Sequence, residues 1–210
     1  ENSPEPIDHP PFEDNGYITF GCFNNFAKVT DPVLEAWAKI LERAADARLL
    51  LEIAGIEQPN FRNEVEKRLK NFGLPLERVI FEPRKSSNQF ILYNRMDIAL
   101  DPFPCNGGTT SMDTLWMGVP FVTLAGRQFV SRMGVTILKN AGLQELIAED
   151  TEKYVDLAVN LAQDKARLKK MRHKLRDKIK SSPLMDHQKF AKNMEAAYRA
   201  MWEKWCKLGN

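Results

Sequence analysis

"DIALDPFPCNGGTTSMDTLWMGVPFVTLAG", residues 97–126, holds two apolar strand patterns with one helical segment between them. Residues 97–103 and 120–126 are short runs of apolar side chains, many of them branched or aromatic, as is typical of buried strands. Gly107 and Gly108 mark the turn at which the first strand is followed by a helix. A strand, a helix and a strand in this order predict a parallel pair joined by a right-handed crossover.

The same alternation continues on both sides of this unit. Further strand patterns occupy residues 17–23, 47–55, 78–83 and 145–148. Further helix patterns occupy residues 30–45, 60–73, 86–96 and 131–142, the first of them with Thr30 or Asp31 as its cap and Pro32 in its first turn. Six strands separated by helices predict an α/β fold, a Rossmann-like doubly wound parallel sheet.

Composition divides the chain into three parts. Residues 1–16 carry four prolines among acidic and small polar residues, which predicts a linker from a preceding region, without helix or strand. Residues 17–150 form the alternating lobe, and residues 151–210 predict helices that pack on it. In the last helix we expect burial of the apolar side chains at helical spacing, which are Phe190, Met194, Tyr198, Met201 and Trp205.

Residues 165–180 are a basic amphipathic segment with nine Lys or Arg and one acidic residue. One interpretation is a surface that binds nucleic acid or membrane. The other is a helix that docks through one apolar seam, formed by Leu168, Met171, Leu175 and Ile179, and exposes its charges to solvent. The segment has no aromatic side chain that could stack on a base, which favours the docked helix.

Bulk composition excludes several classes of protein. The 210 residues have a formal net charge of +2, which gives no general attraction to nucleic acid. No apolar run approaches the roughly 18 residues that a membrane span needs. The three cysteines are scattered and odd in number, which indicates a reducing compartment rather than disulfides or a zinc site. We therefore expect a cytoplasmic protein without a membrane partner.

Ligands of parallel α/β sheets bind beyond the carboxyl ends of the strands. The segments that reach this edge are residues 24–29, 82–87, 102–110 and 125–132. In the third of them, Gly107 and Gly108 allow a ligand to approach the backbone, and the N-terminus of the following helix favours an anion. Thr109 and Thr110 add two hydroxyl groups at the same point.

Asp113 lies one helical turn beyond these threonines and can share their face of the helix. A carboxylate repels phosphate but accepts hydrogen bonds from a sugar diol, so phosphate near Thr109 and Thr110 with ribose near Asp113 is one interpretation. The alternative is an ordinary Gly turn with a Thr cap and an acidic residue in the first turn. Both interpretations fit this stretch.

Other polar side chains are predicted at the same edge. Asn25 and Lys28 follow the first strand and combine an amide with a point charge, which suits a diphosphate. Asparagine is also common in loops for turn geometry alone. Arg84 and Lys85 follow the third strand and can offer backbone groups to a base and side chains to phosphate, whereas Ser131 is better explained as a helix cap.

The strand ends carry no carboxylate pair, His–Cys cluster or Ser-His-Asp set. We therefore expect no metal and no cofactor. The lobe is predicted to be the donor-binding half of an enzyme whose base lies elsewhere.

Three stretches carry a resemblance to a known family: "GCFNNFAKVTDPVLEAWAKIL", "LDPFPCNGGTTSMDTLWMGVPFVTLAG", and "SSPL" with "AYRAMWEKW". From about residue 16 to 206 the chain resembles the C-terminal catalytic lobe of the protein O-GlcNAc transferase and SPINDLY family. The resemblance implies a GT-B glycosyltransferase with two Rossmann-like lobes, usually behind tetratricopeptide repeats.

The resemblance also implies roles for individual residues. Asn25 and Lys28 match the diphosphate loop, and Lys28 would stabilise the leaving group. The family's threonine pair and ribose-binding acid match Thr109, Thr110 and Asp113, and its backbone contacts to the base match the region of Arg84 and Lys85.

Two positions depart from the animal O-GlcNAc transferases. Gly108 stands where those enzymes carry a histidine. Phe90 falls at the position of their base-stacking histidine, in a segment one residue shorter. The "MGVP" and "AYRAMW" segments are similar to plant SPINDLY proteins.

The resemblance implies an inverting transfer of GlcNAc from UDP-GlcNAc, the donor substrate, to Ser or Thr of acceptor proteins. The alternatives are a GDP-fucose-dependent protein O-fucosyltransferase or a degenerate scaffold module. Since the family's catalytic groups lie largely in the preceding N-terminal lobe, this lobe alone would be inactive.

Overall fold

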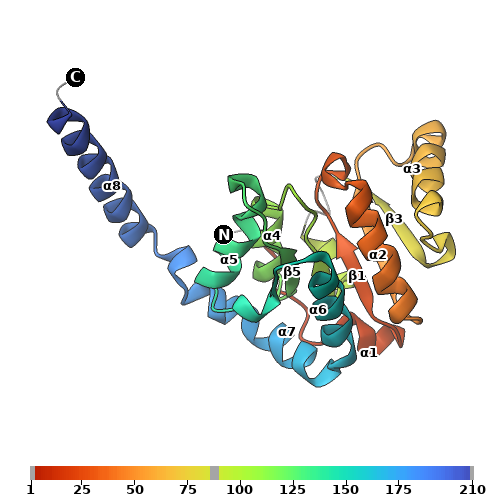
Figure 1. The fold of residues 1–210 in the computed structure, drawn as a ribbon. Helices are drawn as coiled ribbons and strands as arrows, with labels where there is room; N and C mark the ends of the chain where they lie inside the picture. The colour runs from red at the N-terminus through yellow and green to blue at the C-terminus, as the bar shows by residue number, and fades with distance from the viewer. Residues whose placement is uncertain (1–2, 86–89, 209–210) are drawn as a thin grey trace.

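The computed structural model describes residues 3–85 and 90–208. Its centre is a six-stranded sheet of order β3-β2-β1-β4-β5-β6, in which every neighbouring pair is parallel (Figure 1). The strands are β1 (Thr19–Cys22), β2 (Arg48–Ile53), β3 (Val79–Pro83), β4 (Ile98–Leu100), β5 (Phe121–Leu124) and β6 (Ile147–Ala148). The predicted doubly wound parallel sheet is confirmed, and its order changes direction between β1 and β4.

Helices cover the sheet at the predicted places. They are α2 (Asp31–Arg43), α3 (Pro59–Asn71), α4 (Thr109–Trp116), α5 (Met133–Asn140) and α6 (Thr151–Gln163). Thr30 is the N-cap residue of α2, and a proline stands in its first turn, as predicted. The Thr30 hydroxyl donates to the Phe103 carbonyl at 2.9 Å instead of capping the helix, so it ties α2 to the loop after β4.

The core lies between the sheet and its helices. Its largest fully buried side chains include Trp37 of α2, Tyr154 of α6, Phe20 of β1 and Phe121 of β5. Full burial of one such side chain contributes about 2 to 3 kcal/mol before the entropy cost of ordering it. The strands are therefore held by packing on both faces, as a parallel sheet requires.

Short 3₁₀ segments fill several connections: η1 (Phe26–Lys28), η2 (Leu76–Arg78), η4 (Ile91–Arg95), η5 (Phe129–Ser131), η6 (Gln144–Leu146) and η7 (Pro183–Met185). Of the helix predicted at 86–96, the structure shows η4, while residues 86–89 lie outside the described residues. The predicted cap at Ser131 is wrong. Ser131 ends η5 in a capping box with Gln128, and Arg132 precedes α5.

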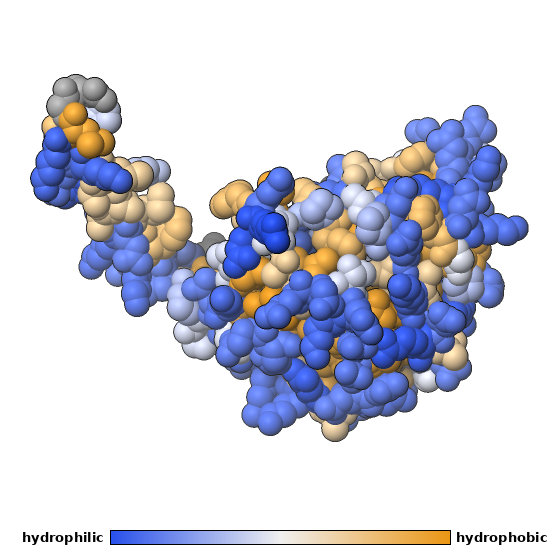
Figure 2. All heavy atoms as spheres, in the orientation of Figure 1, coloured by the Kyte–Doolittle hydropathy of each residue, from blue (hydrophilic) through white to orange (hydrophobic). Residues whose placement is uncertain are grey.

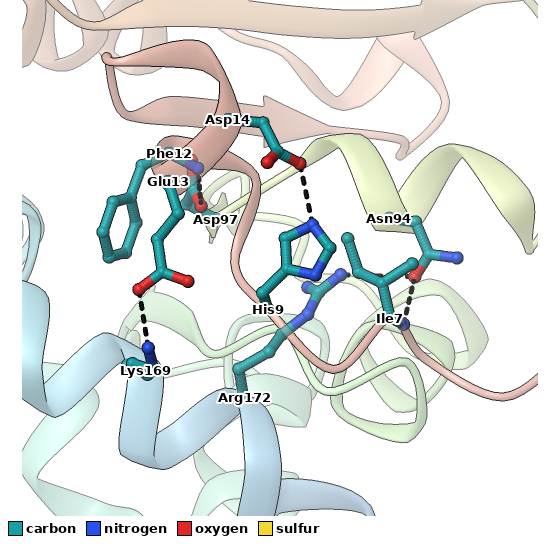
Figure 3. A network of polar contacts seen from close by, with 9 residues as sticks. All are labelled: Ile7, His9, Phe12, Glu13, Asp14, Asn94, Asp97, Lys169 and Arg172. Atoms are coloured by element: carbon teal, nitrogen blue, oxygen red, sulfur yellow. Dashed lines mark hydrogen bonds and ion pairs between the residues drawn. The ribbon is translucent and has the colours of Figure 1, made fainter.

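The N-terminal segment contains a short helix that the sequence did not predict, α1 (Pro11–Asn15). It packs on the lobe because Phe12 is buried and its N–H donates to the Asp97 carboxylate at 3.1 Å. Figure 3 shows this bond together with the bond from the Ile7 N–H to Asn94 and the ion pair of Glu13 with Lys169. Trp116 also donates to the Ser3 hydroxyl, and Arg176 to the Pro4 carbonyl. Residues 3–15 are thus a docked arm, and the boundary at residue 16 stays a prediction.

Asp97 is the buried anchor of this arm. It stands just before β4 and accepts N–H bonds from Phe12 and from Thr19 at the start of β1, at 3.1 Å and 2.8 Å. Burial raises the pKa of the Asp97 carboxyl to about 6, although both hydrogen bonds and the nearby Arg172 lower it. Arg172 is itself buried and donates to the Met96 carbonyl and to Asn94, both at 3.2 Å.

The basic segment forms α7 (Lys165–Lys180), which docks as the second interpretation predicted. Leu168, Leu175 and Ile179 are buried against the lobe, and Met171 packs at the margin. Two of its positive charges are buried as well, because Arg172 and Arg176 donate to backbone carbonyls of the lobe and the arm.

The last helix, α8 (His187–Lys207), projects away from the lobe (Figure 1). The prediction that it buries its apolar side chains is wrong: Phe190, Tyr198, Met201 and Trp205 are 66%, 61%, 56% and 48% exposed, and Met194 is only half-buried. Figure 2 shows hydrophobic residues exposed along this projecting helix, beside hydrophilic ones. Across the described part of the chain, neither this nor any other helix has the length and apolarity to cross a membrane.

The raised pKa of Asp97 predicts how stability changes with pH. The folded protein keeps a proton on Asp97 that the unfolded chain releases near its ordinary value of 3.8. The contribution of the Asp97 proton to the free energy of unfolding is therefore fully present below pH 3.8 and is lost as the pH rises through about 6. The whole contribution is on the order of 3 kcal/mol.

Asp97→Asn, which is neutral at every pH, is expected to remove this dependence. Thermal unfolding of the wild type and the variant between about pH 4 and pH 7 measures it. We expect the wild type to lose stability relative to the variant as the pH rises; a constant difference would contradict the assignment.

Candidate functional site

Three loops meet beyond the carboxyl ends of β1, β4 and β5. The half-buried Lys28, in η1 after β1, donates from Nζ to the Asn106 carbonyl at 3.0 Å. The Asn106 N–H donates to the Val130 carbonyl, also at 3.0 Å. Lys28 and the Gly turn were both predicted at this edge, and the structure brings them together.

Gly107 is required where it stands because no side chain fits there. A Cβ atom on Gly107 would lie 2.2 Å from Ser111 Oγ and about 3 Å from the amide of the buried Asn24. Gly108 is different: a Cβ there would meet only Met133 Cε, at 3.8 Å. The turn is therefore tight on its inner side and open on its outer side.

The Gly turn leads directly into α4. Gly108 is its N-cap residue, and no described side chain caps this end. The first N–H groups of a helix lack intrahelical partners and carry partial positive charge, so this end suits an anion. Thr109 is exposed and Thr110 is half-buried in the first turn, with the Thr110 carbonyl accepting from Thr114 and, at 3.4 Å, from the Tyr93 hydroxyl.

A buried carboxylate supports the turn from behind. Asp101 follows β4 and is 2% exposed. It accepts from the Gly107 N–H at 2.7 Å and from the Thr123 hydroxyl of β5 at 2.6 Å. Burial raises the pKa of Asp101 to about 7, while these hydrogen bonds and the charge of Lys28 lower it.

Asp113 and Phe90 line one groove of about 370 Å³, together with Met112, Trp116, Ile179, Met185 and Ser3 of the arm. Asp113 is half-buried, and burial raises the pKa of its carboxyl. An acidic acceptor and an aromatic ring therefore face the same space.

Two more predicted residues, Asn25 and Arg84, line a second groove of about 340 Å³ together with Arg68 and Glu52. The Asn25 side chain accepts from the Ala27 N–H at 3.0 Å, which is the turn role left open above. Arg84 donates to the Phe23 carbonyl at 3.3 Å and pairs with Glu52 at 3.4 Å. Lys85 is exposed.

Asp101 and Glu52 are the polar site residues that the sequence reasoning missed. Glu52 lies in β2 and is 5% exposed; burial raises the pKa of its carboxyl, and Arg84 opposes the rise. The available signal was a single acidic residue inside an otherwise apolar run, in "LLLEI" and in "IALD". A charged side chain that is buried this deeply needs hydrogen-bond or ionic partners. These partners hold the side chain in one position in the site.

The fold is that of a Rossmann-like lobe of the GT-B glycosyltransferase type. The model of one family, glycosyl transferase family 41, matches residues 12–194. The chain therefore belongs to glycosyl transferase family 41, and the resemblance seen in the sequence is confirmed.

Named relatives agree with this family. The Arabidopsis thaliana protein named probable UDP-N-acetylglucosamine–peptide N-acetylglucosaminyltransferase SPINDLY is 41% identical over 209 residues, which are 98% of this chain and 23% of that protein. The Petunia hybrida protein of the same name is 39% identical over 208 residues, 97% of this chain and 22% of that protein. The chain thus spans less than a quarter of the length of these relatives.

Among solved structures, a mutant of the Thermobaculum terrenum O-GlcNAc transferase superposes with a TM-score of 0.85 at 35% identity. The superposition covers 100% of this chain and 39% of that one.

The two glycines of the turn make a matched pair of substitutions. Gly107→Ala is expected to destabilise the protein by about 1 to 3 kcal/mol, since its methyl group must displace Ser111 or Asn24. Gly108→Ala is expected to change stability little, because its methyl group has room. Thermal unfolding of both variants measures the difference, and equal effects would contradict the described packing of the turn.

Proposed function

We propose that this lobe binds the nucleotide-sugar donor of a protein O-glycosyltransferase that transfers GlcNAc from UDP-GlcNAc to Ser or Thr. The observation that carries the proposal is the open N-terminus of α4 at the change of strand order, with Lys28 held beside it at Asn106. The names of the relatives and of the structural neighbour support GlcNAc as the sugar.

In this proposal the donor diphosphate lies at the start of α4. Thr109 and Thr110 supply N–H groups and hydroxyls, and Lys28 Nζ has donor capacity left beyond its bond to Asn106. The outer side of the turn at Gly108 leaves room for the sugar. These charges and dipoles meet the phosphate without a metal or cofactor.

The nucleoside extends into the groove lined by Asp113 and Phe90. Asp113 accepts hydrogen bonds from the ribose hydroxyls, and the Phe90 ring stacks on the base. Arg84 and Lys85 contribute through their backbone, because the Arg84 guanidinium is already engaged by Glu52 and the Phe23 carbonyl.

Transfer then proceeds with inversion at the anomeric carbon. The acceptor hydroxyl attacks this carbon, its proton passes to a base of the preceding lobe, and the bond from the anomeric carbon to the diphosphate oxygen breaks. Lys28 and the α4 N-terminus stabilise the negative charge that develops on the departing diphosphate.

The partners of the lobe are the donor, the protein acceptor and the remaining parts of the same protein. We assign to those parts a preceding catalytic lobe and tetratricopeptide repeats. The exposed apolar side chains of α8 support a further surface packed against this chain, since contiguous exposed apolar patches mark interaction sites.

Lys28→Ala tests the leaving-group role. In the intact protein we expect transfer to slow on the order of 100-fold and the affinity for UDP to fall, because one preorganised positive charge is lost. Lys139→Ala on the exposed surface of α5 changes the net charge equally and should leave both unchanged.

Calorimetric titration with UDP, UDP-GlcNAc, GDP and GDP-fucose identifies the donor by comparing the affinities of the four ligands. Binding of the uridine ligands alone, weakened by Lys28→Ala, is the expected result. Preferential binding of GDP and GDP-fucose would instead indicate GDP-fucose as the donor. A folded protein that binds none of the four ligands would favour the scaffold alternative.

A further inference from the structure

Two buried aspartates flank β4, and they differ in what they hold. Asp97, at the amino end of the strand, fixes the N-terminal arm through Phe12 and the start of β1 through Thr19. Asp101, at the carboxyl end, fixes the turn that leads into α4. Ligands of parallel sheets bind at the carboxyl end, so only the second aspartate adjoins the proposed donor site.

Asp101 joins three elements through one carboxylate. Oδ1 accepts the Gly107 N–H at 2.7 Å and lies 3.4 Å from the Ser111 hydroxyl in the first turn of α4. Oδ2 accepts the Thr123 hydroxyl of β5 at 2.6 Å. Every partner can donate, and above the pKa of Asp101 the ionised carboxylate, which only accepts, satisfies all of them at once.

Backbone packing keeps this arrangement closed. A Cβ atom on Gly134, in the first turn of α5, would lie 2.2 Å from Thr123 Oγ1 and 2.7 Å from Asp101 Oδ2. The α5 backbone therefore covers the Asp101–Thr123 contact directly. Tyr154 of α6 donates to the Asp101 carbonyl at 3.1 Å from the other side. The carboxylate has little freedom to move, and the turn it holds shares that rigidity.

We propose that Asp101 is a positioning residue, which fixes Gly107 and the first turn of α4 in the orientation that receives the donor diphosphate. The inference rests on the proposed function, because it assigns Asp101 to the same site. Asp101 does not touch the donor: it lies behind the turn, and the groups that face the donor are those of Thr109, Thr110 and Lys28.

Asn in place of Asp101 keeps the shape but turns one acceptor oxygen into a donor. The amide oxygen can still accept from the Gly107 N–H while the NH2 group faces the Thr123 hydroxyl, which also accepts, but the neutral amide is a weaker acceptor than the carboxylate, so the bond to Gly107 weakens. Loss of the charge assistance in such a bond corresponds to about a tenfold change in an equilibrium. We expect Asp101→Asn to weaken UDP-GlcNAc binding about tenfold.

The matched control is Asp97→Asn, which makes the same chemical change at the other end of β4. Titration calorimetry with UDP-GlcNAc and thermal unfolding are measured on the intact wild type and on both variants. We expect both variants to lose stability, and only Asp101→Asn to lose affinity. The amide proton resonance of Gly107 should move in Asp101→Asn and stay in place in Asp97→Asn.

Wild-type affinity in Asp101→Asn, or an equal loss in Asp97→Asn, would overturn the positioning role while leaving the proposed function intact. Failure of the folded wild type to bind UDP-GlcNAc would overturn both. If Asp101→Asn does not fold, Thr123→Val serves as the test, because it keeps the carboxylate but removes the hydrogen bond between Oδ2 and β5. Unchanged affinity for UDP-GlcNAc in Thr123→Val would overturn the inference.

Discussion

β1 and β4 pair in parallel at the centre of the sheet, although nearly 80 residues of chain separate them, and the loops that follow both strands leave the same edge. The contact between Lys28 and the Asn106 carbonyl follows from this pairing. Antiparallel pairing would send the two loops to opposite edges. The candidate site therefore depends on the strand order before it depends on any single side chain.

Buried carboxylates at the two ends of β4 set the local geometry. Asp97 and Asp101 each accept backbone N–H groups in the core, and burial raises the pKa of both. A buried charge is expensive unless its hydrogen bonds are satisfied, so each aspartate specifies the conformation of the segment it holds. One end of the strand is thereby fixed to the N-terminal arm, and the other to the turn before α4.

Local patterns predicted most of the fold. The strands and helices up to residue 148, with their parallel arrangement, follow from apolar period, helix caps and glycine turns. Capping by Ser131 was wrong because the serine had a nearer partner in Gln128. Helix α1 of the arm, residues 11–15, was missed because it is too short for periodicity and depends on a tertiary bond to Asp97.

Contacts between elements that are distant in the sequence were harder to predict. The apolar face of α8 was read as core-facing, since periodicity shows that a helix has an apolar face but not which surface covers it. For the site, the glycines, threonines and Lys28 were predicted from their position at strand ends. Asp101 was missed because its partners Gly107 and Thr123 come from different elements, which only the folded sheet brings together.

A crystal structure of the intact protein with bound UDP-GlcNAc would show whether the N-terminus of α4 holds the donor diphosphate. We predict phosphate oxygens within hydrogen-bond distance of Thr109, Thr110 and Lys28 Nζ, with the ribose at Asp113. A diphosphate seated instead between Arg68 and Arg84 in the neighbouring groove, with α4 uncontacted, would contradict it.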